Sequence, residues 1–435
     1  MTMPHSIPFN RRSFLSTTSA LTAAALAPRA WARAAQPGRA DELRVALIGC
    51  GGRGTGAALQ ALATDGSVRL VAMADAFGDR LDSSLAEIVN KLPAQVDVPA
   101  ERRFVGFEAY QGALATDVDV AVLCTPPGFR PQHFQAAVAR GCHVFMEKPV
   151  AVDAPGVRSV LAAAALAKQK GLKVGVGLQR RHDPMYQETV KRIQEGALGK
   201  LVLLRCYWNS SGVWVNPRKP GQSEMEHQMR NWYYFNWLCG DHIVEQHIHN
   251  LDVCNWIQKG FPTRAQGQGG RQARVGPEYG EIYDHHAVEY AYADGTLMLS
   301  QSRHIPGCWE NVSEHAHGAL GTAEVSAGKL EVAGQAPWKW RGEAVDPYQK
   351  EHDELFAAIR GGTDYNEAEI GAYSTLTAIM GRMATYSGKV ITWEQALNSE
   401  LALAPARLGW NETPPVLAGE RGLYPAAIPG LTRAI

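Results

Sequence analysis

The stretch LRVALIGCGGRGTGAALQALA, residues 43–63, restricts the possible folds more than any other part of the chain. An apolar strand over Val45–Ile48 runs into GCGGRG and then into a helical pattern. In this G-x-G-x-x-G order the first glycine permits a tight turn, the second lets a pyrophosphate approach the backbone, and the third allows close packing of helix on strand. The stretch predicts a parallel α/β domain that binds a dinucleotide. Its candidate cofactor contacts are Gly49, Gly51, Gly52, Arg53 and Gly54.

An acidic residue follows the next predicted strand, Val68–Ala74, at the position expected of a ribose ligand. Asp75 stands twenty-one positions beyond Gly54. A carboxylate there accepts a hydrogen bond from the ribose 2′-hydroxyl of NAD and repels the 2′-phosphate of NADP. NAD is therefore favoured, and the nearby Arg80, also a candidate cofactor contact, keeps NADP as the alternative. A flavodoxin-like domain without a dinucleotide remains the other interpretation of the strands.

Two further predicted strands end in candidate site residues. Val118–Leu123 is followed by Thr125 and Pro126, and Cys142–Met146 by Glu147-Lys148-Pro149. Ligands bind beyond the carboxyl ends of parallel strands, which places these residues at the predicted site. On physical grounds alone, a single lysine after a strand is more often a surface residue.

The segment TPPGFRPQHFQAAVARGCHVFMEKPVAVD, residues 125–153, resembles the cofactor domain of the glucose–fructose oxidoreductase/inositol dehydrogenase/rhizopine-catabolism (Gfo/Idh/MocA) family, including its Glu-Lys-Pro motif. The resemblance implies that Lys148 lies beside the nicotinamide and holds the reacting hydroxyl. The further candidate cofactor contacts in this segment are Thr125, Pro126, His133, Glu147 and Lys148 itself.

The pattern changes after residue 150. Helices are expected over 155–170 and 184–195 and a strand over 174–178, followed by long alternating runs such as LVLLRCYWN and HHAVEYAYADGTLMLSQSRH. Such alternation predicts a mostly antiparallel sheet with one exposed or oligomer-forming face. The expected fold class is α/β, with a Rossmann domain over 43–150, a C-terminal α+β domain with a large open sheet over 151–402, and a surface tail over 403–435. The resemblance implies a homo-oligomer, dimer or tetramer.

Two late segments, KEHDELFAAIRGG and the stretch from Gly371 to Leu397, are expected to form amphipathic helices. The family resemblance implies that they return to pack beside the cofactor domain.

Residues 240–252, GDHIVEQHIHNLD, crowd three histidines and three carboxylates together. Read as one helix, the stretch puts His242, Glu245, His249 and Asp252 on one face. It resembles the family's D-x-G-x-H-x-x-D helix, which implies that Glu245 and His249 are the catalytic pair. Glu245 stands where the family has Asp, and His247 where it has Gly. The longer carboxylate shifts the acidic group, and the extra imidazole narrows or polarises the pocket.

Oxidation of a secondary alcohol needs a base for the hydroxyl proton and a nearby hydride acceptor. His249 can be that base at neutral pH, with Glu245 orienting its ring and Lys148 lowering the pKa of the hydroxyl. Two alternatives stay open: a Zn²⁺ or Mn²⁺ site built from His242, Glu245 and His249, and a plain buried polar helix. We expect no metal. The candidate substrate contacts are Arg180, Arg181, Trp232, His242, His247 and Asp252.

The first residues differ in kind from the rest of the chain. NRRSFL at residues 10–15 precedes a mild apolar run and then small residues, which resembles a twin-arginine export signal over 1–34 followed by an arm over 35–42. The apolar run is too short to span a bilayer. With 43 basic and 43 acidic residues, the balanced charge argues against nucleic acid as a partner. Seven widely spread cysteines suggest no disulfide framework.

Export constrains the chemistry, because nicotinamide nucleotides are recycled in the cytoplasm. The cofactor must stay tightly bound and be reset in each cycle. One way is to oxidise a sugar, glycoside or polyol and reduce a second carbonyl substrate, and this is ranked first on family frequency. A second is NAD-dependent glycoside hydrolysis through transient oxidation at C3, elimination and re-reduction. A non-catalytic sugar or nucleotide sensor is a third interpretation.

Overall fold

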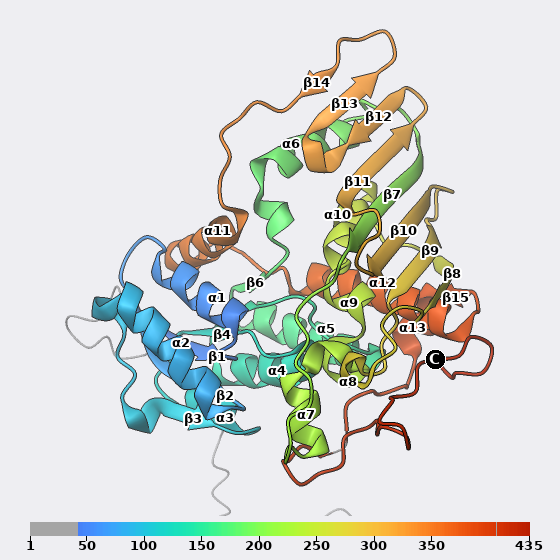
Figure 1. Cartoon of the computed structure of the whole chain (residues 1–435). Helices are drawn as coiled ribbons and strands as arrows, with labels where there is room; N and C mark the ends of the chain where they lie inside the picture. Colours follow the sequence, from blue (N-terminus) through green and yellow to red (C-terminus); the bar gives the residue numbers. More distant parts are fainter. Residues whose placement is uncertain (1–41, 406) are drawn as a thin grey trace, which may run out of the picture. The chain divides into compact units, whose positions relative to one another are not determined.

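The computed structural model describes residues 42–405 and 407–435 (Figure 1). The predicted export signal over 1–34 and the predicted arm, apart from Glu42, lie outside the described residues. The two sheets belong to one unit, Glu42–Ile435, and the boundary at residue 150 stays a prediction.

The first sheet is the predicted parallel sheet. Its six strands follow the order β3-β2-β1-β4-β5-β6, and each neighbouring pair is parallel. The bounds are β1 Leu43–Ile48, β2 Val68–Asp75, β3 Arg103–Val105, β4 Val120–Leu123, β5 His143–Met146 and β6 Val174–Val176. The predicted strands are confirmed, with β4, β5 and β6 shorter at one end. The sequence did not reveal β3, because it has three residues and none of them is buried.

Helices cover both faces of this sheet, which is why its strands are apolar runs rather than alternating ones. Val45 and Leu47 of β1 join one buried cluster, and Ala46 and Ile48 join the other. The connecting helices are α1 Gly52–Leu62, α2 Gly78–Lys91, α3 Ala109–Ala115, α4 Arg130–Arg140 and α5 Ala154–Gln169.

The second sheet has nine strands in the order β14-β13-β12-β11-β7-β10-β9-β8-β15. The prediction of a mostly antiparallel sheet is confirmed, with β10 and β7 as the parallel pair. The alternating runs form β7 Leu201–Ser210, β9 His285–Ala291 and β10 Leu297–His304. The other strands are β8 Arg264–Gly270, β11 Asn311–Gly318, β12 Gly321–Glu324, β13 Lys329–Val332, β14 Trp338–Lys339 and β15 Ile391–Thr392.

The two late helices behave differently from each other. α11 Pro347–Gly361 packs on α1 beside the first sheet, as the resemblance implied. α12 Ala368–Ser387 packs against α5, α10 and β8 and is buried along nearly its whole length. The prediction of an amphipathic helix was therefore wrong for α12, because it lies between α5 and the second sheet rather than at the surface. Figure 1 shows it between the two sheets.

The stretch GDHIVEQHIHNLD is not one helix. It forms α9 His242–Glu245 and α10 Ile248–Gln258, separated at Gln246 and His247. The series of helical hydrogen bonds is interrupted where the His247 N–H donates to the His242 carbonyl oxygen, five residues back, at 3.2 Å. The prediction of a single helix with one polar face was wrong, because this wider turn ends the regular i to i−4 pattern.

The remaining helices are α6 Pro184–Gln194, α7 Glu224–Arg230, α8 Asn236–Cys239 and α13 Trp393–Asn398. After α13 the described chain has no helix or strand, and the surface tail over 403–435 stays a prediction. None of the described helices is long and apolar enough to cross a membrane. Among the described residues, no disulfide is formed by Cys50, Cys124, Cys206, Cys239, Cys254 or Cys308.

Candidate active site

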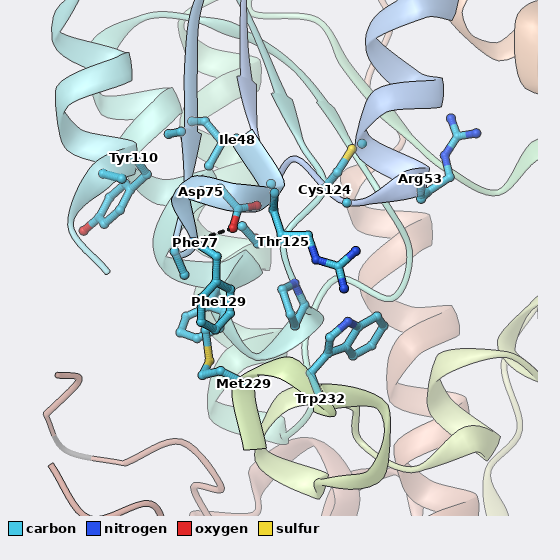
Figure 2. A pocket seen from close by; sticks show the side chains of 18 of the residues that line it. Ile48, Arg53, Asp75, Phe77, Tyr110, Cys124, Thr125, Phe129, Met229 and Trp232 are labelled. Carbon is cyan, nitrogen blue, oxygen red and sulfur yellow. Dashed lines mark hydrogen bonds between the residues drawn. The ribbon is translucent and has the colours of Figure 1, made fainter. Parts of the chain in front are cut away.

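A cavity of ≈ 540 Å³ opens where β1, β2 and β4 end (Figure 2). This is the edge at which the sequence predicted the dinucleotide. Eleven of the predicted site residues line it: Gly49, Gly51, Gly52, Arg53, Gly54, Asp75, Arg80, Thr125, Pro126, His133 and Trp232. Glu147 and Lys148, predicted as cofactor contacts, are not part of its lining.

The glycines divide into two kinds. Gly49 has a φ of +99°, and a Cβ on Gly54 would lie 1.9 Å from the Gly49 carbonyl oxygen, so these two allow the turn and the close helix packing. A Cβ on Gly51 or Gly52 would meet no described atom within 4 Å, which leaves open space beside the first turn of α1. No described side chain caps this eleven-residue helix, so its first N–H groups are available to an anion.

Asp75 is held at the end of β2 by the backbone. Its Oδ2 accepts from the Cys50 N–H at 2.6 Å and its Oδ1 from the Phe77 N–H at 2.8 Å, the bond drawn in Figure 2. Burial raises the pKa of this carboxyl group, while the two backbone bonds and Arg80 oppose the rise. The carboxylate has lone pairs left to accept from a ribose hydroxyl. Open glycines, a free helix N-terminus and this acid together fit a dinucleotide such as NAD.

Sequence reasoning missed an aromatic wall of this cavity. Phe77, Phe107, Tyr110, Phe129 and Trp214 line it. Phe77 and Phe107 each follow the carboxyl end of a strand, β2 and β3, so the strand-end rule points to them once β3 is recognised. Trp214 is distant in sequence from any recognised motif.

Lys148 and Glu245 meet although they are 97 positions apart. The Lys148 Nζ donates to the Glu245 carbonyl oxygen at 2.6 Å and to its Oε1 at 3.3 Å. Burial raises the pKa of the Glu245 carboxyl group, and the Lys148 ammonium opposes that rise. Glu147 holds the main chain at Lys148, because its Oε2 accepts from the Lys148 main-chain N–H at 3.2 Å. Its Oε1 accepts from Arg53 at 2.6 Å.

His249 lies near the same lysine as a neutral base. Burial lowers its pKa well below the usual 6.5, and the positive charges of Lys148 and Arg180 lower it further. Its ring stacks on Trp208, with the centroids 5.9 Å apart, and its buried Nδ1 has no hydrogen-bond partner among the described residues. The Glu245 carboxylate pairs with Lys148, and no bond from it to His249 is found in the described chain, so its role in orienting that ring stays a prediction.

Two predicted substrate contacts bind each other. The Arg181 guanidinium donates to both oxygens of Asp252 at 2.8 Å, and Ser374 donates to the same carboxylate at 2.7 Å. Arg180 is paired with the buried Glu314. These contacts anchor the segment before α6 to α10 and β11, and the substrate roles of the two arginines and Asp252 stay predictions.

The extra histidines of the motif point into the protein interior. His247 is fully buried, and its Nε2 lies 2.7 Å from the Ser300 hydroxyl on β10. His242 is fully buried with its ring 4.3 Å from that of His304. The structure therefore does not bring His242, Glu245 and His249 together as a metal site; the described potential ligand group that includes His242 is Asp241, His242 and His286.

The sequence profile of an oxidoreductase family with an NAD-binding Rossmann fold, Gfo/Idh/MocA, matches residues 43–178. Inositol 2-dehydrogenase 4 of Saccharopolyspora erythraea is 32% identical over 356 residues, which cover 80% of this chain and 94% of that protein.

Solved structures share the fold over a similar length. Aldose-aldose oxidoreductase from Caulobacter crescentus, complexed with glycerol, matches with a TM-score of 0.63 at 18% identity, covering 81% of this chain and 99% of that one. Levoglucosan dehydrogenase in complex with NADH and levoglucosan matches with a TM-score of 0.64 at 15% identity, covering 81% and 100%. A relative of this identity across nearly its entire length, together with the matching profile and fold, shows that the chain belongs to the Gfo/Idh/MocA family of oxidoreductases.

Proposed function

We propose that this enzyme oxidises a secondary hydroxyl of a sugar, glycoside or polyol by hydride transfer, with an NAD that stays bound through the cycle. The contact of Lys148 with Glu245 beside the neutral His249 carries the proposal, because it gathers a cation, a carboxylate and a base at one place. Relatives named inositol 2-dehydrogenase and levoglucosan dehydrogenase support the substrate class.

Each residue has a distinct task in this reaction. His249 accepts the hydroxyl proton, for which its neutral ring is prepared by burial. The Lys148 ammonium donates a hydrogen bond to the hydroxyl oxygen and stabilises the negative charge that develops there. Glu245 holds the lysine in place through two bonds. When bound, NAD would accept the hydride from the same carbon and return it to a second carbonyl substrate, which is reduced in the same cycle.

The acid at the end of β2 supports NAD over NADP, since Asp75 stands where a 2′-phosphate would have to fit. Tight retention and export by the twin-arginine route are parts of the same proposal. An exported enzyme without a cytoplasmic nucleotide supply works repeatedly only when its cofactor is kept and reset.

The first test measures the nucleotide carried by the purified protein. We expect denaturation to release close to one NAD(H) per chain, with little NADP. An empty protein that binds NAD weakly would contradict the retained cofactor.

A second test identifies the net reaction. The enzyme is incubated with aryl glycosides and free sugars in D₂O. We expect a ketone or lactone product without release of the aglycone. Release of the aglycone with deuterium at C2 would instead identify NAD-dependent glycoside hydrolysis by the same hydride chemistry.

A further inference from the structure

Three side chains of metal-binding types lie together in the interior. Donor atoms of Asp241, His242 and His286 all lie within 4.8 Å of one another. Asp241 and His242 come from the turn into α9 and from α9 itself, and His286 comes from β9. The ring of His304, on β10, stacks on that of His242 at 4.3 Å and lies outside this group.

The cluster is buried but not internally satisfied. Asp241 and His242 are 0% exposed, His304 is 1% and His286 is 2% exposed. Both nitrogens of His242 and both of His304 have no hydrogen-bond partner within the described chain, whereas the His286 Nε2 lies 3.2 Å from the Asp241 Oδ1. Buried polar atoms without a partner destabilise a fold, and so many of them around one carboxylate point to a missing partner.

The carboxylate is fixed toward the histidines. The Asp241 Oδ2 accepts from the Tyr386 hydroxyl at 2.5 Å and the Tyr283 N–H at 3.0 Å, while its Oδ1 lies 3.2 Å from the His286 Nε2. Asp241 has a φ of +74°, a conformation that non-glycine residues rarely adopt. A strained residue with a fixed acceptor is typical of a functional position.

We propose that Asp241, His242 and His286 bind one structural Zn²⁺. Two imidazoles and one carboxylate are ligands that zinc accepts, whereas Mg²⁺ and Ca²⁺ prefer oxygen ligands. Full burial leaves no open position for a substrate, so the ion is structural rather than catalytic.

The ion would join the start of α9 to β9. α9 ends at Glu245, which contacts Lys148, so the site holds one end of the short helix whose other end reaches the proposed catalytic residues. The zinc stabilises the fold and keeps Glu245 in place without touching the reacting atoms.

The test measures metal in untagged full-length protein made with zinc in the growth medium. We expect close to one equivalent of zinc per chain by mass spectrometry of the elements. After chelation, Zn²⁺ alone should raise Tm by roughly 5 °C. Less than a tenth of an equivalent, together with no response of Tm to Zn²⁺, would overturn the proposal even if every variant failed to fold.

Two variants localise the ion. His242→Gln and His286→Gln should lose the bound zinc and the Tm response to it. The matched control is His352→Gln, because His352 on α11 is also fully buried with both ring nitrogens unpartnered in the described structure, but lies against Phe145 instead. The control should keep its zinc. Zinc that persists in His242→Gln and His286→Gln, or that is lost in the control, would contradict the assignment.

Discussion

Lys148 is the residue on which the proposed chemistry depends most directly. We expect Lys148→Met to lower kcat by about 10²- to 10⁴-fold, because it removes the cation that stabilises the developing oxyanion. The nucleotide content should stay unchanged, since Lys148 does not line the cofactor cavity. Steady-state rates and released nucleotide per chain measure the two effects.

The control is Lys170→Met, because the bonds that Lys170 donates within the described part of the chain go to main-chain oxygens of α4, those of Val138 and Ala139. It should keep the kcat of the unmodified enzyme. If Lys148→Met turned over normally, the interpretation as a sensor or a different catalytic centre would replace the proposed mechanism.

At the scale of single residues, the sequence predicted those positions at which the backbone geometry allows only one kind of residue. Gly49, Gly54 and Asp75 follow from the geometry of a strand, a turn and a helix around a dinucleotide. It did not predict that Arg181 and Asp252 bind each other, because side chains 71 positions apart become neighbours only in the folded chain.

Helices α11 and α12 are connected to the segment before α6 by one histidine. His182 lies 2.7 Å from Glu354 of α11 and 3.1 Å from Glu367, the residue before α12. Burial lowers the pKa of His182, but the two carboxylates outweigh it and raise the pKa to about 9. Below about 6.5 both the folded and the unfolded chain hold this proton, so the stabilisation is complete there; it is lost as the pH rises through about 9.

We therefore expect His182→Gln to lower the free energy of unfolding by on the order of 2 kcal/mol at about pH 6 and by much less at about pH 9.5. Urea unfolding at the two pH values measures the difference. His317→Gln, which replaces a partly exposed histidine on β11, should show no such dependence. An equal loss for His182→Gln at both pH values would contradict the charged role of His182.

Elements were predictable where a single period ran through them. The strands of the first sheet are continuous apolar runs, and β7, β9 and β10 alternate, so their type was clear. The motif GDHIVEQHIHNLD misled, because its apolar and polar residues match a helix although the main chain turns at Gln246. The prediction for α12 failed for another reason. Its sequence suggested an amphipathic helix, but nearly the whole helix is buried, because its neighbours come from both sheets.

The chain as a whole encloses its cofactor cavity with residues from distant parts. Trp410, in the tail, packs on Phe77 at 5.1 Å and Phe107 at 4.7 Å between ring centroids, behind the aromatic wall. Arg230 of α7 lies over Phe77 and bonds Asp79 at 3.0 Å. The tail is fastened nearby, since Gln228 donates to the Val416 carbonyl at 2.7 Å.

We expect Trp410→Ala to speed the release of bound nucleotide by about 3- to 10-fold, because each aromatic pair contributes about 0.5–1.5 kcal/mol. Release into excess unlabelled nucleotide is measured with labelled NAD. Leu431→Ala is the control on the same tail, as Leu431 is 80% exposed. Unchanged release from Trp410→Ala would show that the tail does not hold the aromatic wall.

The position of Trp410 also sets an order of events during biosynthesis. Phe77 and Phe107 emerge from the ribosome long before their partner, so the glycine-rich loop and Asp75 exist while the wall behind the nucleotide is still unsupported. If NAD is retained as proposed, a nascent chain that binds it at that stage should release it faster than the finished protein does. If the protein is also exported in its folded state as proposed, a retained nucleotide would mark a chain whose tail has already been translated and docked.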